Sequence, residues 1–117
     1  MLKYQSYFLT LLLAKEDKQV ANAVIYYQQK ESESIEEAIS YINYLIKFME
    51  LHHDIKGVFV DSFGSRSEFY DFLNTSLNNV DIIVLEESLN DEFDDKLLTE
   101  VARAENIRID YFKQTDL

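Results

Sequence analysis

The sequence contains no cysteine, no proline and only two glycines. Without cysteine, the chain has no disulfide scaffold, no thiol nucleophile and no cysteine-based zinc site. The lack of proline and the scarcity of glycine argue against collagen, proline-rich linkers and a turn-dense all-β sandwich. The hydrophobic stretch near the N-terminus, Phe8 to Leu13, is far shorter than the about 20 residues that span a membrane. The composition therefore predicts a globular domain without a membrane segment.

Basic residues are scarce as well. Eleven lysines and arginines stand against 22 aspartates and glutamates, which gives a formal net charge of −11. This negative charge repels nucleic acids and anionic lipids, so we expect neither DNA nor a membrane surface as a partner. Hydrophobic residues nevertheless make up 47% of the chain and aromatic residues 14%, which is enough for a packed core. The length predicts a single domain, residues 1–117.

Residues 1–18 predict an N-terminal helix with one apolar face. A signal peptide would carry small residues for cleavage after this stretch, where the chain has Lys15 to Lys18, so the expected location is the cytoplasm. Apolar stripes of this kind usually pack on their own domain, but this one also fits a surface that docks a partner. In the second case aromatic anchors would dominate the interface, and the contact residues would be Tyr4, Tyr7, Phe8 and Leu11.

Strand patterns alternate with helix patterns along the rest of the chain. The expected strands lie at residues 20–27, 55–60, 80–85 and 107–111, and the expected helices at 35–49, 69–77 and from 88–90 to 104. Because parallel strands need crossover helices, this alternation predicts a three-layer α/β fold over residues 20–112. We expect a mostly parallel four-stranded sheet with crossover helices, to which the N-terminal helix is added.

Several local patterns make this expectation more specific. Ser34 and Glu37 form a capping box at the start of a helix, and Ser65 to Glu68 predicts a second one. The apolar stripes predicted to be buried begin with Ile35 and Ile39 in the first crossover helix and with Phe93 in the last. His52 and His53 are expected at a solvent-facing helix end rather than at a metal.

Ligands of open α/β sheets bind beyond the carboxyl ends of the strands, which here carry residues 27–30, 61–66 and 86–88. No glycine follows the first strand, which excludes a dinucleotide-binding turn and a P-loop there. A phospho-acceptor receiver domain would need acidic residues where this chain has glutamines, so Asp61 is expected to end a strand or cap a helix. Glu86 and Glu87 are consecutive and face opposite sides, which argues against an acid/base pair.

Motifs at these strand ends resemble those of one enzyme family. Tyr26 to Lys30 stands where the family has Tyr-x-Arg-x-Ser, and a helix start similar to the family's follows at residues 34–38. Val58 to Asp61 resembles the second strand, and Gly64 to Ser67 stands in place of a mobile Ser-Gly-Arg-Ser-like loop. Residues 80–85 and 106–109 resemble the later strands. Over about residues 20–112 the chain resembles the catalytic domain of serine recombinases, the resolvase/invertase family.

The resemblance implies a serine hydroxyl that attacks a DNA phosphodiester, with arginines that neutralise the phosphate. This chain departs from the family at those positions, because Lys30 stands at the nucleophile, Gln28 replaces the strand-end arginine, and only Arg66 is a retained family-like arginine. The segment from Glu87 to Asp91 replaces Asp-Arg-Leu-x-Arg. The degenerate active-site positions are Tyr26, Gln28, Lys30, Asp61, Arg66 and Glu87. We therefore expect no DNA cleavage, no cofactor and no metal.

The leading hypothesis is a non-catalytic resolvase-like domain that acts as a regulatory or accessory factor through protein contacts. It would form a homodimer or pair with another protein. A second hypothesis is an acidic DNA mimic that inhibits a DNA-binding protein by occupying its basic site. The acidic patch of such a mimic would be Glu86, Glu87, Asp91, Glu92, Asp94 and Asp95. A third is residual DNA recombinase-type activity, and a fourth is an enzyme of another type that uses Asp61, Arg66 and Glu87.

Overall fold

The computed structural model describes residues 20–75 and 77–113. In chain order the elements are β1 (Ala21–Gln28), α2 (Ile35–Glu50), β2 (His53–Asp61), α3 (Ser67–Leu73), β3 (Ile82–Leu85), α4 (Glu92–Ala104) and β4 (Arg108–Tyr111). The expected N-terminal helix, with its candidate contact residues Tyr4, Tyr7, Phe8 and Leu11, lies outside the described residues.

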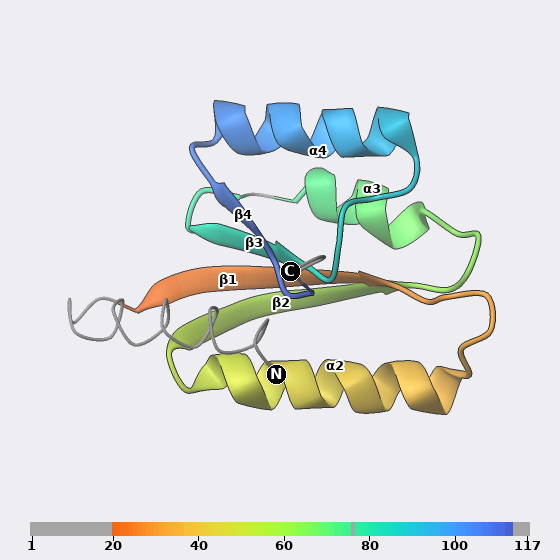
Figure 1. Ribbon diagram of the computed structural model, residues 1–117. Helices are drawn as coiled ribbons and strands as arrows, with labels where there is room; N and C mark the ends of the chain where they lie inside the picture. The colour runs from red at the N-terminus through yellow and green to blue at the C-terminus, as the bar shows by residue number, and fades with distance from the viewer. Residues whose placement is uncertain (1–19, 76, 114–117) are drawn as a thin grey trace.

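The four strands form one parallel sheet in the order β2-β1-β3-β4. Helix α2 covers one face, and α3 and α4 cover the other (Figure 1). This arrangement confirms the predicted three-layer α/β fold. The chain first steps from β1 to β2 on one side and then returns to place β3 on the other side of β1. The carboxyl ends of β1 and β3 therefore form the switch point at which open α/β sheets bind their ligands.

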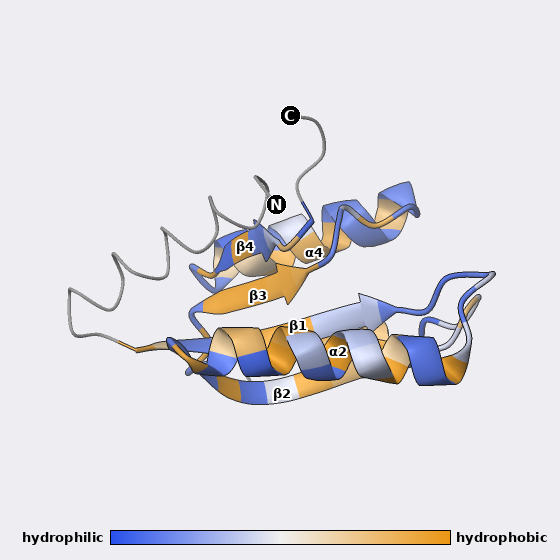
Figure 2. Ribbon diagram, turned by 60° about the horizontal axis from the view of Figure 1, so that its bottom comes forward, coloured by the Kyte–Doolittle hydropathy of each residue, from blue (hydrophilic) through white to orange (hydrophobic). Residues whose placement is uncertain are grey.

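Strand β3 lies between β1 and β4 and is a continuous apolar run, because both of its faces are buried. All four of its residues are buried, and the strand is hydrophobic over its whole length (Figure 2). Ile83 and Leu85 pack in the core under α3 and α4, together with Phe69, Phe72 and Leu98. Ile82 and Val84 face the other way, toward the core under α2. A strand with alternating polar residues could not fill both cores at once.

Helix α2 begins at the predicted capping box, whereas the second predicted box is wrong. Ser34 Oγ accepts from the amide of Glu37 at 3.1 Å, and the Glu37 side chain accepts from the amide of Ser34 at 2.8 Å. Helix α3 instead starts after Arg66, whose side chain makes no cap hydrogen bond. The Asp61 carboxylate at the end of β2 accepts from the first amides of α3, so Asp61 is a capping residue as expected.

Three further local expectations are wrong. His53 is buried at the start of β2, because α2 ends at Glu50 rather than at the histidines. Phe93 is 67% exposed and Asp94 is buried, since the inner face of α4 is set by Asp94, Leu98 and Ala102 at four-residue intervals. On α2, Ile35 and Ile39 are exposed. The buried residues of that helix are Ala38, Ile42, Leu45 and Met49.

No helix among the described residues is long and apolar enough to cross a membrane.

Candidate functional site

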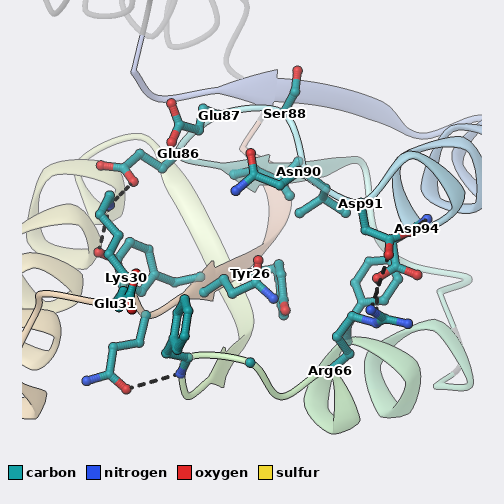
Figure 3. A pocket seen from close by; sticks show the side chains of 18 residues that line it. Tyr26, Lys30, Glu31, Arg66, Glu86, Glu87, Ser88, Asn90, Asp91 and Asp94 are labelled. Carbon is teal, nitrogen blue, oxygen red and sulfur yellow. Dashed lines mark hydrogen bonds and ion pairs between the residues drawn. The ribbon is translucent and has the colours of Figure 1, made fainter.

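An open pocket of about 330 Å³ lies at the carboxyl ends of β1 and β3 (Figure 3). We call it the strand-end pocket. Its walls include residues 26–31 at and after the end of β1, residues 85–91 at and after the end of β3, and Phe63, Gly64 and Arg66 from the loop between β2 and α3. The structure thus brings together the three strand ends that sequence reasoning singled out. The position is the one where open α/β sheets hold their ligands.

Tyr26 and Asp61 form the floor of this region. The Tyr26 hydroxyl donates to Asp61 Oδ2 at 2.6 Å, and both residues are at most 2% exposed. Asp61 also accepts from the amides of Glu68 at 2.8 Å and Phe69 at 3.0 Å. Burial, followed by the hydrogen bond to Asp61, raises the pKa of Tyr26 far above its ordinary value. Tyr26 therefore stays protonated and serves as a donor to Asp61 rather than as a nucleophile.

Lys30 lies on one wall of the pocket and is paired with Glu86. Its ammonium group forms an ion pair with the Glu86 carboxylate and also donates to the Tyr27 hydroxyl at 3.2 Å. Burial lowers the pKa of Lys30, but the contacts with Glu86 and then Tyr27 outweigh it and raise the pKa above its ordinary value. Burial and the hydrogen bond to Glu33 raise the pKa of Tyr27 to about 12. Lys30 is therefore a fixed cation at neutral pH.

Arg66 lies on the opposite wall and is held by two carboxylates. It contacts Asp94 Oδ2 at 2.9 Å and Asp91 Oδ2 at 3.2 Å. The Tyr70 hydroxyl donates to the other oxygen of Asp94 at 2.8 Å, and Asp94 is only 3% exposed. Asp91 also caps α4 by accepting from the amide of Asp94 at 3.0 Å. The two anchors of Arg66 are thus fixed by α3 and α4 before any ligand arrives.

Gln28 and Glu87, which the sequence analysis compared with recombinase active-site positions, add no positive charge to the pocket. Gln28 makes only a long contact of 3.4 Å from its amide nitrogen to the carbonyl oxygen of Ser65. Glu87 is exposed and lies 3.9 Å from Lys113. The charged lining residues are Lys30, Arg66, Glu31, Glu86, Glu87, Asp91 and Asp94. The carboxylates therefore outnumber the cations, and each cation of the lining is already paired.

The six residues of the proposed acidic patch do not share one exposed surface. Glu87 and Glu92 are exposed. Asp94 is buried, and Glu86, Asp91 and Asp94 are paired with Lys30 or Arg66. Asp95 is half-buried and accepts from the amide of Leu89 at 3.4 Å. Most of this acidic segment therefore stabilises the walls of the pocket and the start of α4.

Nucleophilic or metal chemistry finds little support at this pocket. No histidine is among its described lining residues, so Ser88 has no imidazole base beside it. Within residues 20–75 and 77–113, no group of three or more histidine, aspartate or glutamate side chains is arranged to hold a metal ion. The groups that remain can donate and accept hydrogen bonds and hold opposite charge, but they do not form an activated nucleophile.

Sequence reasoning missed Tyr70 and the pairing of Asp94 with Arg66. Tyr70 follows Arg66 by four residues, a spacing that places the two side chains on one face of α3, and this signal could have found it. Nothing local pointed to Asp94, because a run of acidic residues at a helix start is typical of a solvated helix end.

No known protein family, no curated protein and no solved structure is significantly similar to this chain. Function must therefore be inferred from the chemistry of the residues themselves.

Proposed function

We propose that this chain is a non-catalytic, serine-recombinase-like domain that acts in the cytoplasm by binding a protein, as a regulatory or accessory factor. The partner is a second copy of the chain or another protein. One observation carries the proposal: both cations of the strand-end pocket, Lys30 and Arg66, are neutralised by carboxylates of the chain itself. A pocket that supplies its own anions is poorly suited to a phosphate.

The chemistry of phosphoryl transfer supports the same proposal. A serine recombinase needs a hydroxyl nucleophile and several free arginines around the phosphate, because charge develops on the phosphate oxygens in the transition state. Lys30 occupies the nucleophile position and stays protonated, and Arg66 is held by Asp91 and Asp94. Residual recombinase activity would have to break these ion pairs first. An enzyme of another type would meet the same obstacle at Arg66.

The DNA-mimic hypothesis is less well supported. A mimic presents unpaired carboxylates to solvent at the spacing of DNA phosphates, whereas Glu86, Asp91 and Asp94 are paired with Lys30 or Arg66. Only Glu87 and Glu92 of the acidic segment are exposed. We therefore keep protein binding through another surface as the proposed function.

The test of the proposal is a DNA titration with a gain-of-charge variant. We expect the natural chain to leave the fluorescence anisotropy of a labelled mixed-sequence duplex unchanged at low salt. The variant carrying Glu86→Gln and Asp91→Asn frees Lys30 and loosens Arg66, and asparagine can still cap α4. This variant should therefore gain weak, salt-sensitive DNA binding. A matched control with Glu92→Gln and Glu105→Gln changes the net charge by the same amount outside the pocket lining. This control should not gain DNA binding.

Two results would contradict the proposal. One is tight, salt-sensitive DNA binding by the natural chain, which would mean that the groups around the pocket open to admit a phosphate backbone. The other is a covalent 5′-phosphoseryl adduct on any duplex, which would establish catalysis directly. Light scattering on the same sample measures the mass in solution and separates a homodimer from a chain that awaits another protein.

A further inference from the structure

A second concavity lies beside the first half of α2 and shares Gln29 with the strand-end pocket. We call it the α2 groove, and its volume is about 440 Å³. Its apolar lining comes from α2 and from the end of β2, namely Ile35, Ala38, Ile39, Ile42 and Val60. In Figure 2 this helix faces the viewer with β2 beside it. The groove is open to solvent, because Ile35, Ile39 and Val60 of its lining are exposed.

The apolar side chains of this groove are unusually exposed for their type. Ile35 is 63% exposed, Ile39 is 52% exposed and Val60 is 39% exposed. They adjoin one another across α2 and β2, whereas Ala38 and Ile42 of the same groove are buried. Contiguous exposed apolar residues around a concavity mark a binding surface more often than scattered single residues do.

The charged lining residues of the α2 groove are carboxylates. They include the buried Asp61, and no lysine or arginine is among the described lining residues. Glu36, which follows Ile35 on α2, is exposed. Across residues 57–77 the only cation is Arg66, which is held by Asp91 and Asp94 in the strand-end pocket. Glu68 lines the groove itself. DNA and an anionic membrane would meet like charge here, so the complementary occupant is basic.

The shape of the groove favours a helix as the occupant. Ile35, Ile39 and Ile42 repeat at intervals of four and three residues, so the stripe spans about 10 Å, or two helical turns. A strand would have to add to the edge of β2, where the register shifts between Ala23 and Val24 and skips Lys56. Irregular pairing of this kind, together with the exposed Asp54–Lys56 ion pair, blunts a sheet edge against strand addition.

We propose that the α2 groove binds an amphipathic helix of a partner protein. The helix carries apolar residues at three- and four-residue intervals, with lysine or arginine on its flanks. Its apolar face covers Ile35, Ile39 and Val60, and its basic flanks lie against Glu36 and Glu68. This inference rests on the proposed protein-binding function and names the class of partner and the surface that it contacts.

The test uses a labelled synthetic 18-residue peptide with leucines at helical spacing and lysines on both flanks. We expect saturable binding by anisotropy, with amide shift changes in the nitrogen–proton NMR spectrum confined to residues 35–42 and 60–68. Replacing Ile35 and Ile39 with serine should weaken binding about tenfold or more, as expected for central apolar anchors. Leu51→Ser should leave it unchanged, because Leu51, the residue that follows α2, is 65% exposed but lies outside the groove lining.

Two control peptides and one charge variant separate the apolar from the electrostatic contribution. A scrambled peptide of the same composition should not saturate, because its leucines no longer share one face. A peptide with glutamate in place of lysine should bind more weakly by a few fold, as should the variant Glu68→Lys with the basic peptide. Asp71→Lys is the matched charge control, because Asp71 is exposed on α3 outside the groove.

Each outcome decides between the two proposals. Equal binding of the scrambled peptide, or no loss on replacing Ile35 and Ile39, overturns the groove inference. Shift changes confined to the strand-end pocket overturn it as well, but leave protein binding in place. If no peptide binds and a DNA duplex shifts the amides around Arg66, both the groove inference and the proposed function are wrong.

Discussion

The strand-end pocket and the α2 groove are neighbouring concavities with opposite chemistry. In the pocket, Lys30 and Arg66 are paired with carboxylates from other segments of the chain. In the groove, Ile35 and Ile39 are left more than half exposed. The ion pairs within the pocket hold segments of the fold together. An apolar groove that the described residues leave exposed makes binding more favourable, because a partner that covers it removes apolar surface from water. The difference indicates which of the two surfaces is available for binding.

Asp61 connects the two concavities, which also share Gln29 as a lining residue. Asp61 lines the α2 groove, and its carboxylate accepts from Tyr26, which lines the strand-end pocket. The same carboxylate caps α3 through the amides of Glu68 and Phe69. Asp61 therefore links the two concavities while it holds the end of β2 to the start of α3.

The largest loss of stability is expected when the Asp61 carboxylate is removed. Asp61→Ala removes a helix cap and leaves the buried Tyr26 hydroxyl without its acceptor, so we expect the free energy of unfolding to fall by about 3 kcal/mol. Urea unfolding followed by circular dichroism measures it. Glu87→Ala, at an exposed position of the same pocket, should change the free energy of unfolding by less than about 0.5 kcal/mol. Equal effects for the two variants would mean that the hydrogen bonds of Asp61 add no stability to the fold.

The next effect concerns the wall of the pocket. Asp94→Ala leaves Arg66 with Asp91 alone and deprives the Tyr70 hydroxyl of its acceptor. We expect a loss of about 1–2 kcal/mol in the free energy of unfolding, because removing a buried carboxylate also relieves part of its desolvation cost. Glu92→Ala in the same helical turn is the exposed control. A stabilised Asp94→Ala variant would show that the pocket retains Asp94 for binding rather than for stability.

Much of the fold could be predicted from the sequence because its signals are local. The capping box of Ser34 and Glu37, the continuous apolar run of β3 and the left-handed Asn106 after α4 are each determined by a few adjacent residues. Asn106 has a φ of 58°, a conformation that asparagine tolerates better than most residues. Alternation of such elements was enough to fix the parallel sheet.

The charge pairing of the site could not be predicted in this way. The Tyr26–Asp61 hydrogen bond joins residues 35 positions apart, and Lys30 meets Glu86 across 56 positions. The exposure of Ile35 and Ile39 was missed for a related reason. A helical stripe predicts an apolar face, but how much of that face the sheet covers depends on contacts distant in sequence. Val60, near the end of β2, lines the same groove as Ile35 and Ile39 and leaves both exposed.

The next prediction concerns how stability depends on pH. Neither concavity has a histidine among its described lining residues, so we expect the response near neutral pH to come from outside both of them. Burial lowers the pKa of His53 below its ordinary value, and a hydrogen bond with the Met49 backbone opposes this only in part. The unfolded chain therefore binds the proton more readily, so stability falls as the pH drops through about 6.5, by at most about 1.4 kcal/mol per pH unit. Between pH 5.5 and 7.5, the urea midpoint should depend less steeply on pH in the variant His53→Gln than in the natural chain. An unchanged slope would place the titrating group elsewhere.

The smallest expected effect tests the α2 groove itself. Replacing Ile35 and Ile39 with serine should change the free energy of unfolding by less than about 0.5 kcal/mol, because both side chains already face solvent and the two residue types have similar helix propensities. Ile42→Ser, one turn further along and 6% exposed, should cost at least about 2 kcal/mol. If the exposed pair costs as much as Ile42, the stripe belongs to the core, and the distinction between a self-satisfied pocket and an open groove fails.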